Sequence, residues 1–322
     1  LSDYAVRPDG SLLLVGSSAV IEPFWPETGR IVHIGFDRRN VKSTEFRAVL
    51  EDEQGRIWLG GNQELLRVDG PGAIPKIWHK QSPISASLLG PVRHLQKTAN
   101  QLLWVAYYGG GLQARDPEGN VLHTITPKSG HGLQFPDPEQ LFKGPDGQLW
   151  LVGGEGILRW DAKKAGFIRP PGSPQDRLYS AFVGPEDTLW IGRLGQLDSY
   201  RWLPLSGELR KLSSFAGDDG LPAVEISGIA KDARGVLWLS TSRGLVRFNR
   251  KDKRARLYGI NDGLISQEFD VRAPYISPGG QAFALTKSGV VSFRPEEMLA
   301  APEPLRLVLE QVSVRRGEDD IR

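Results

Sequence analysis

Residues 231–249 read KDARGVLWLSTSRGLVRFN. A turn ending at Gly235 precedes an apolar run centred on Trp238, and a second turn with Gly244 precedes another apolar run (245–248). Glycine readily adopts the positive φ that tight hairpin turns require. The stretch therefore predicts two short antiparallel strands joined by a hairpin.

The same pattern returns along the whole chain. Its tryptophan position is occupied seven times, five times by Trp and twice by another apolar residue. Successive occupants are separated by 45, 46, 46, 40, 48 and 45 residues, a regularity that scattered core tryptophans would not keep. We call this set the column; its members are Leu13, Trp58, Trp104, Trp150, Trp190, Trp238 and Phe283.

Each repeat contains four short apolar runs separated by turns, with no helical stretch of ten or more residues between them. Four short strands in a repeat of about 45 residues are typical of one propeller blade. The sequence therefore predicts an all-β fold, a seven-bladed β-propeller of four-stranded antiparallel blades over residues 1–304. The one helix that we expect is short, over 295–300, where a proline and two acidic residues suit a helix N-terminus.

Composition excludes several classes of function. The chain carries 40 Lys and Arg against 38 Asp and Glu, so a net charge of +2 favours neither nucleic acid nor a membrane surface as a partner. The absence of cysteine excludes disulfides and cysteine-based metal sites. The chain lacks the apolar run of about 18 residues that a transmembrane helix needs. Its first residues do not resemble a signal peptide, and no serine-hydrolase elbow or phosphate-binding loop occurs.

The repeat resembles the regulator-propeller repeat of bacterial two-component sensors. That repeat has a turn with Asp and Gly, a Leu-Trp-Leu or Leu-Trp-Ile strand, a Gly-Leu pair, and then an aromatic residue with Asp or Asn. Residues 231–249 fit it almost throughout, and the likeness extends from residue 1 to about 294. The tail (293–298 and 304–309) looks like the passage into a triple-tyrosine immunoglobulin-like domain.

The resemblance implies a periplasmic sensor domain of a membrane-anchored signalling protein. In that family a stalk domain and a membrane helix lead to a cytoplasmic output, which is a histidine kinase or a diguanylate cyclase. The expected function is to bind a small-molecule or saccharide ligand, or a partner domain, on the top face of the propeller. Neither the type of output nor the formation of a homodimer follows from the sequence.

The repeat also predicts which polar side chains meet at the mouth of the central channel. Positions 13 and 11 before each column residue are mostly polar, whereas the position between them is mostly apolar. Such alternation is typical of a strand with one buried face, and the turn after the second strand reaches the same end of the blade. We expect the ligand-binding residues to be Glu45, Arg47, Arg93, Tyr107, Tyr108, Asp137, Glu139, Arg177, Tyr179, Arg193, Glu225, Arg243, Asp270 and Arg272.

These residue types suit an anionic or hydroxyl-rich ligand, because guanidinium groups match carboxylates and sulfates while tyrosine rings pack on sugar rings. A second interpretation is that the charges pair with one another and only solvate the rim. A third is a propeller hydrolase or lyase, similar to lactonases, with a divalent cation in the channel. The ligands of that cation would be Glu45, Asp137, Glu225 and Asp270.

The sequence favours a binding site without catalytic residues, metal or cofactor. Arg47, Arg93 and Arg272 stand one step deeper than the four carboxylates and would neutralise them. Of the five histidines, only His94 is placed near the top of an inner strand, where a lone acid or base could act.

Ring closure is the last expectation. Only twelve residues precede Leu13, enough for the inner strand of the first blade but not for an outer strand that completes the seventh. A bare outer edge invites aggregation. We expect the apolar run 305–312 to pair with 290–293; the alternative is that 305–322 begin the stalk domain.

Overall fold

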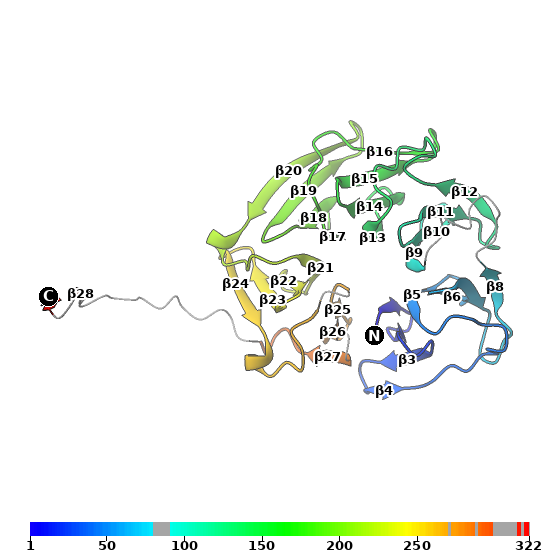
Figure 1. Ribbon diagram of the computed structural model, residues 1–322, viewed down its shortest axis with the longest axis horizontal. Coiled ribbons are helices and arrows are strands. Elements are labelled where there is room, and N and C mark those ends of the chain that lie inside the picture. Colours follow the sequence, from blue (N-terminus) through cyan, green and yellow to red (C-terminus); the bar gives the residue numbers. More distant parts are fainter. Residues whose placement is uncertain (80–90, 270–271, 287–288, 299–313, 317–318, 322) are drawn as a thin grey trace.

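The computed structural model describes residues 1–79, 91–269, 272–286, 289–298, 314–316 and 319–321. Seven small sheets stand around a central axis, each with its first strand nearest the axis (Figure 1). Consecutive strands within a sheet pair antiparallel. The predicted all-β, seven-bladed propeller is confirmed.

Six blades have four strands each. Blade 1 consists of β1 (Asp3–Val6), β2 (Leu12–Val15), β3 (Ile21–Trp25) and β4 (Arg30–Ile31). Blade 2 consists of β5 (Phe46–Glu51), β6 (Ile57–Gly61), β7 (Glu64–Val68) and β8 (Lys76–His79). Blade 3 consists of β9 (Val92–Lys97), β10 (Leu103–Tyr107), β11 (Gly111–Arg115) and β12 (Val121–Ile125). Blade 4 consists of β13 (Pro138–Lys143), β14 (Leu149–Gly153), β15 (Gly156–Asp161) and β16 (Gly166–Ile168).

The remaining blades follow in order around the ring. Blade 5 consists of β17 (Ser180–Val183), β18 (Thr188–Gly192), β19 (Leu197–Leu203) and β20 (Glu208–Phe215). Blade 6 consists of β21 (Ile226–Lys231), β22 (Leu237–Thr241), β23 (Gly244–Asn249) and β24 (Arg254–Tyr258). Blade 7 has three strands in the described residues, β25 (Tyr275–Ile276), β26 (Ala282–Thr286) and β27 (Gly289–Phe293). Two 3-10 turns, η1 (Gly217–Asp219) and η2 (Ile260–Asp262), precede blades 6 and 7, and β28 (Val314–Arg316) pairs with β29 (Asp319–Ile321).

The column lies on the second strand of every blade, and each of its members is at most 4% exposed. Seven apolar clusters fill the seams between neighbouring blades, and each column residue belongs to a different cluster. Burying one such large side chain stabilises the fold by about 1.5–3 kcal/mol. The repeat period thus places one large apolar side chain in every seam.

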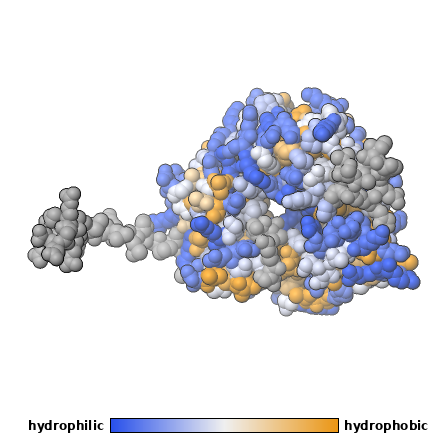
Figure 2. Space-filling model, viewed as in Figure 1, coloured by the Kyte–Doolittle hydropathy of each residue, from blue (hydrophilic) through white to orange (hydrophobic). Residues whose placement is uncertain are grey.

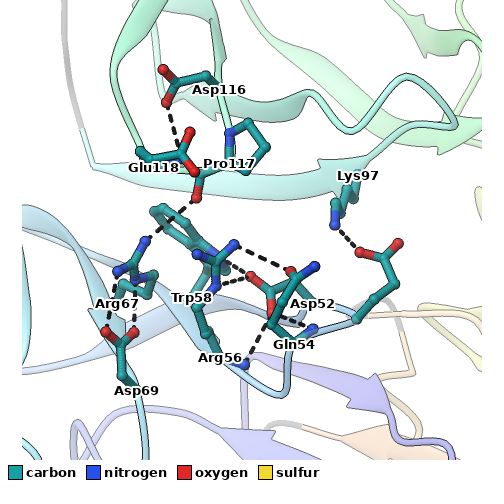
Figure 3. A network of polar contacts seen from close by, with 11 residues as sticks. Asp52, Gln54, Arg56, Trp58, Arg67, Asp69, Lys97, Asp116, Pro117 and Glu118 are labelled. Atoms are coloured by element: carbon teal, nitrogen blue, oxygen red, sulfur yellow. Dashed lines mark hydrogen bonds and ion pairs between the residues drawn. The ribbon is translucent and has the colours of Figure 1, made fainter.

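A hydrogen bond joins the turn before the column residue to the side chain of the column tryptophan. In blade 2, the Asp52 carboxylate accepts the indole N–H of Trp58 through Oδ2 (3.0 Å) and the N–H groups of Gln54 and Arg56 through Oδ1 (Figure 3). A buried indole N–H needs such a partner. Three other column tryptophans have the same kind of bond, namely Trp104 to Thr98, Trp150 to Asp146 and Trp238 to Asp232.

A polar link also crosses from blade 2 to blade 3. The Arg67 guanidinium lies over the Trp58 ring, 5.3 Å from its centroid, and pairs with Asp69 at 2.7 Å. Its Nη1 donates to the carbonyl oxygen of Pro117 in a loop of blade 3 (Figure 3). Arg67 therefore connects the Trp58 ring of blade 2 to a loop of blade 3.

Blade 1 meets both of its neighbours through Asp3, whose side chain is buried. Its Oδ2 accepts a hydrogen bond from the backbone N–H of Val49 in blade 2 (2.9 Å). Its Oδ1 accepts a hydrogen bond from Nε of Arg272, which lies just before blade 7. The Tyr4 hydroxyl donates to the carbonyl oxygen of Ala273 (2.9 Å). The predicted inner strand within the first twelve residues is present as β1, and it joins the two ends of the ring.

Two expectations about the C-terminal part fare differently. The helix predicted over 295–300 is wrong for its described portion, since 295–298 form a turn in which the N–H of Glu297 bonds to the carbonyl oxygen of Arg294. A segment of six residues gains too few hydrogen bonds to offset the cost of helix nucleation. The pairing of 305–312 with blade 7 lies outside the described residues and stays a prediction. Among the described residues, we find no helix with the length and apolarity to span a membrane.

Candidate functional site

A β-bulge recurs on the inner strands of blades 2, 3, 4 and 6. In each case one residue has no partner on the second strand, while the residues before and after it pair with two adjacent residues of that strand. A bulge bends its strand and re-aims the side chain of the extra residue. The bulged residues are Arg47, Arg93, Glu139 and Ser227, each eleven positions before its column residue, and all four line the central channel.

The channel opens at this end into a cavity of about 680 Å³, which we call the upper chamber. Seen along the ring axis, the centre of the molecule is hollow and bordered largely by hydrophilic residues (Figure 2). Seven of the fourteen expected residues line this chamber, namely Glu45, Arg47, Arg93, Tyr108, Glu139, Tyr179 and Glu225. The other lining residues are Leu1, Ser2, Pro91, Val92, His94, Ser227 and Ser242.

Two arginines at the upper chamber share one carboxylate. Arg93 lines the chamber, whereas Arg177 contacts two of its lining residues, Glu139 and Tyr179, without lining it itself. Nη2 of Arg93 lies 2.7 Å from Oε2 of Glu139, and Nη2 of Arg177 lies 2.6 Å from Oε1 of the same side chain. These three residues come from blades 3, 4 and 5. The hydrogen bond that Arg177 donates to Glu139 raises the pKa of Arg177 above its usual value. The group, which we call the arginine bridge, carries one net positive charge.

Both guanidinium groups of the arginine bridge lie over tyrosine rings. That of Arg93 is 5.7 Å from the centroid of Tyr108, and that of Arg177 is 5.5 Å from the centroid of Tyr179. A guanidinium has five N–H donors, and each arginine uses one of them on Glu139. The arrangement therefore leaves oriented donors, backed by aromatic faces, for a further acceptor.

The other sides of the upper chamber differ in chemistry. Glu45 and Arg47 of blade 2 pair with each other, with Nε 2.7 Å from the carboxylate. In blade 6, the hydroxyl of Ser242 donates to Oε2 of Glu225 (3.5 Å), and the hydroxyl of Ser227 donates to the carbonyl oxygen of Ser240. Within the described residues, Glu225 takes part in no ion pair.

A second chamber of about 360 Å³ continues the channel, and His94, Glu139 and Ser227 line both. Arg272 lines this lower chamber rather than the mouth, because its ion pair with the buried Asp3 holds it there. Burial and the positive charges of Arg272 and Arg93 lower the pKa of His94 well below its usual value, so its ring is neutral at pH 7. Its Nε2 is buried and has no hydrogen-bond partner in the part of the chain that the structure describes.

Four expected residues point elsewhere. Tyr107 is 5% exposed, and its hydroxyl donates to Gln113 inside blade 3 (2.8 Å). Arg193 pairs with the fully buried Asp198 at 3.0 Å, because a buried carboxylate needs a compensating charge. Asp137 accepts the backbone N–H of Gly109, and Arg243 is an exposed turn residue that lines neither chamber. Asp270 lies outside the described residues.

Some lining residues were not among those expected from the sequence. Ser2 and Ser227 occupy the same repeat position as Arg47 and Arg93, so the repeat alone could have identified them. Ser242 lines the chamber in place of its neighbour Arg243, and the sequence gives no signal for that one-residue difference.

The hypothesis of a channel metal has little support from the geometry. Glu45 pairs with Arg47, and Asp137 bonds to a backbone N–H, so these carboxylates have partners other than a cation. In the residues that the structure describes, no three His, Asp or Glu side chains gather as metal ligands would.

Comparisons with known proteins agree with the repeat. Residues 40–63 match the family model described as two component regulator propeller. Histidine kinase P4 of Formosa agariphila is 31% identical over 80 residues, which are 25% of this chain and 6% of that protein. The chain thus spans a small part of this curated relative.

Solved structures show the same fold at low identity. The extracellular domain of a Bacteroides thetaiotaomicron protein that is assigned to the hybrid two-component systems has a TM-score of 0.66 and 15% identity, over 93% of this chain and 41% of that one. An inactive variant of virginiamycin B lyase from Staphylococcus aureus, determined with quinupristin, has a TM-score of 0.66 and 16% identity, over 90% of this chain and 92% of that one. Identities this low establish the fold alone. This chain is thus a seven-bladed propeller, and its residues 40–63 are similar to the two component regulator propeller repeat.

Proposed function

We propose that the chain is the ligand-sensing part of a membrane-anchored bacterial signalling protein and lies in the periplasm. Three observations support this: the regulator repeat, the sequence similarity to a histidine kinase, and the fold shared with an extracellular sensor domain. In this proposal a stalk follows the propeller and leads to a cytoplasmic output of the histidine kinase or diguanylate cyclase type. Ligand binding changes how the propeller holds that stalk.

The ligand, in this proposal, is a small anionic or hydroxyl-rich molecule, such as a saccharide, in the upper chamber. The observation that carries it is the arginine bridge, where two guanidinium groups share one carboxylate and lie over two tyrosine rings. Charges that only solvated a rim would pair one to one, as Glu45 and Arg47 do. The arginine bridge by itself has one positive charge in excess and keeps free N–H donors, which favours an anion beside Arg93, while Glu225 balances this charge over the chamber as a whole.

The test is a thermal-shift screen of acidic and neutral sugars, followed by titration calorimetry of each hit. A ligand that binds only the native state raises the melting temperature. Arg93→Ala should weaken binding of an acidic hit about tenfold or more, since a hydrogen bond to a charged group contributes roughly 1.5–3 kcal/mol. Arg201→Ala is a matched control, because Arg201 forms an exposed ion pair on the outer part of blade 5. Wild-type affinity in the Arg93→Ala protein would refute this placement of the ligand.

The alternative is a propeller lyase or hydrolase. Its support is the fold shared with virginiamycin B lyase and the position of His94 in the channel, where its side chain lines both chambers. Metal analysis of the purified chain, with and without added Ca²⁺ or Mg²⁺, separates the two functions. Stoichiometric metal that is lost in Glu225→Ala, together with turnover of a lactone or cyclic ester, would favour the enzyme.

A further inference from the structure

The two sides of the upper chamber carry unlike chemistry. On one side lies the arginine bridge, from blades 3 to 5, with its net positive charge. Blade 6 contributes Glu225 and Ser242, and its inner strand β21 lies across the central opening from β9 of blade 3 (Figure 1). A ligand that fills the chamber touches both sides.

Glu225 is built to accept hydrogen bonds from a ligand. Among the described residues its carboxylate has one side-chain partner, the Ser242 hydroxyl at 3.5 Å, which occupies Oε2 weakly and leaves Oε1 open. The other acidic residues of the chamber have arginine partners, Arg47 for Glu45 and the two bridge arginines for Glu139. An ionised carboxylate has about four acceptor sites, so Glu225 retains most of its capacity.

We propose that the upper chamber selects a ligand with two unlike ends, an acidic group bound by Arg93 of the arginine bridge and a pair of hydroxyl groups bound by Glu225 with Ser242. This inference rests on the proposed function and specifies the ligand class as acidic sugars. Two neighbouring hydroxyls can both donate to one carboxylate, and the Ser242 hydroxyl can turn to accept from a third.

The charge of Glu225 interacts with that of Arg177, but among the described residues no hydrogen bond or ion pair joins the two side chains. The acceptor sites of Glu225 therefore stay available to a ligand. A carboxylate close to the acidic group of a ligand repels it, so Glu225 favours ligands that also bring hydrogen-bond donors. Ammonium groups share this donor chemistry with hydroxyls, and the experiment must distinguish them.

The experiment is titration calorimetry of the 322-residue chain with three probes. Glucuronate has the acidic group and the hydroxyls, glucose has only the hydroxyls, and γ-aminobutyrate has an acidic group with an ammonium. We expect glucuronate to bind tightest and glucose about tenfold or more weakly, the loss of one charged contact. Tighter binding of γ-aminobutyrate than of glucuronate would overturn the assignment of hydroxyls to Glu225.

Single substitutions test the contacts to the two ends of the proposed ligand separately. Glu225→Gln should weaken glucuronate and glucose by the same factor, about tenfold, and leave their affinity ratio unchanged. Arg93→Ala should weaken glucuronate alone, so that the ratio approaches one. Glu186→Gln, an exposed carboxylate of blade 5, should change neither constant.

Two failures are distinguishable. If the wild-type chain binds these sugars and Glu225→Gln binds them as tightly, the role of Glu225 is wrong while the ligand site stands. If the wild-type chain binds none of the three probes, this inference and the proposed acidic-sugar ligand both fail.

Discussion

Two seams of the ring hold neighbouring blades together through different contacts. They are the seam between blades 4 and 5 and the seam between blades 7 and 1. The first is filled by two tryptophans, Trp150 and Trp202, whose rings meet edge to face at 5.0 Å within a cluster of eleven buried residues. Among the described residues, the second has no tryptophan and five buried residues, with Phe24 and Phe283 at 5.5 Å. The ring therefore closes at a seam with few large apolar side chains.

The polar contacts of Asp3 compensate for the smaller apolar packing at that seam. One buried carboxylate bonds to blade 2 and to Arg272, and Tyr4 bonds to Ala273. Apolar packing depends on area and tolerates small shifts, whereas buried hydrogen bonds require one geometry. Blade 1 and the start of blade 7 are therefore aligned by directional hydrogen bonds, whereas the seam between blades 4 and 5 is held mainly by buried apolar side chains.

The largest expected effect is in the seam between blades 4 and 5. Trp150→Ala removes a fully buried ring and leaves a cavity, which typically costs about 3–5 kcal/mol. Denaturant unfolding should show a much lower midpoint with little change in slope. Trp25→Ala, on a partly exposed ring outside the column, is the control. Equal midpoints for Trp150→Ala and the wild type would contradict the role of the column.

The seam between blades 7 and 1 should depend on Asp3. Asp3→Ala leaves Arg272 and the N–H of Val49 without their partner, and we expect a loss of about 2–4 kcal/mol because Arg272 is partly solvated. Hydrogen exchange should then accelerate first in blades 1 and 7. Uniform acceleration over all blades, or none, would show that this ion pair does not close the ring.

A smaller effect distinguishes the two kinds of column residue. Asp232 holds both its turn and the indole of Trp238, whereas Asp9 of blade 1 bonds to Ser11 and Trp25 but not to its column residue, since the Leu13 side chain has no donor. Asp232→Ala should therefore cost about 1–3 kcal/mol and Asp9→Ala less than about 1 kcal/mol. Thermal unfolding of the two variants side by side measures the difference, and equal losses would refute it.

The smallest effect is on acid stability. Burial would raise the pKa of Asp52, but hydrogen bonds from Trp58 and Arg56 outweigh it and lower the pKa below its usual value. A lowered pKa in the folded state stabilises the protein above the unfolded-state value near 4, and this stabilisation is lost as pH falls below it. Asp52→Asn should thus be less stable at pH 7 and lose less stability between about pH 5 and pH 2. An acid-unfolding curve parallel to that of the wild type would count against this.

The site was partly predictable for the same reason as the fold. A repeat puts equivalent residues at equivalent places, so counting back from the column located Arg47, Arg93, Glu139 and Tyr179 without coordinates. It also assigned Tyr107 and Arg243 to the mouth, where neither side chain lies. A one-residue error in a turn reverses the direction of a side chain.

The sequence by itself determined the number of blades, the column and the inner-strand positions near the channel, because these follow from periodic burial. Only the tertiary structure decided which charges share a partner. The arginine bridge joins residues of three blades, and the ion pair of Asp3 with Arg272 joins two residues 269 positions apart. The bulges that aim the bridge inward have no sequence signature here, because a bulge depends on how two strands pair and not on either strand alone.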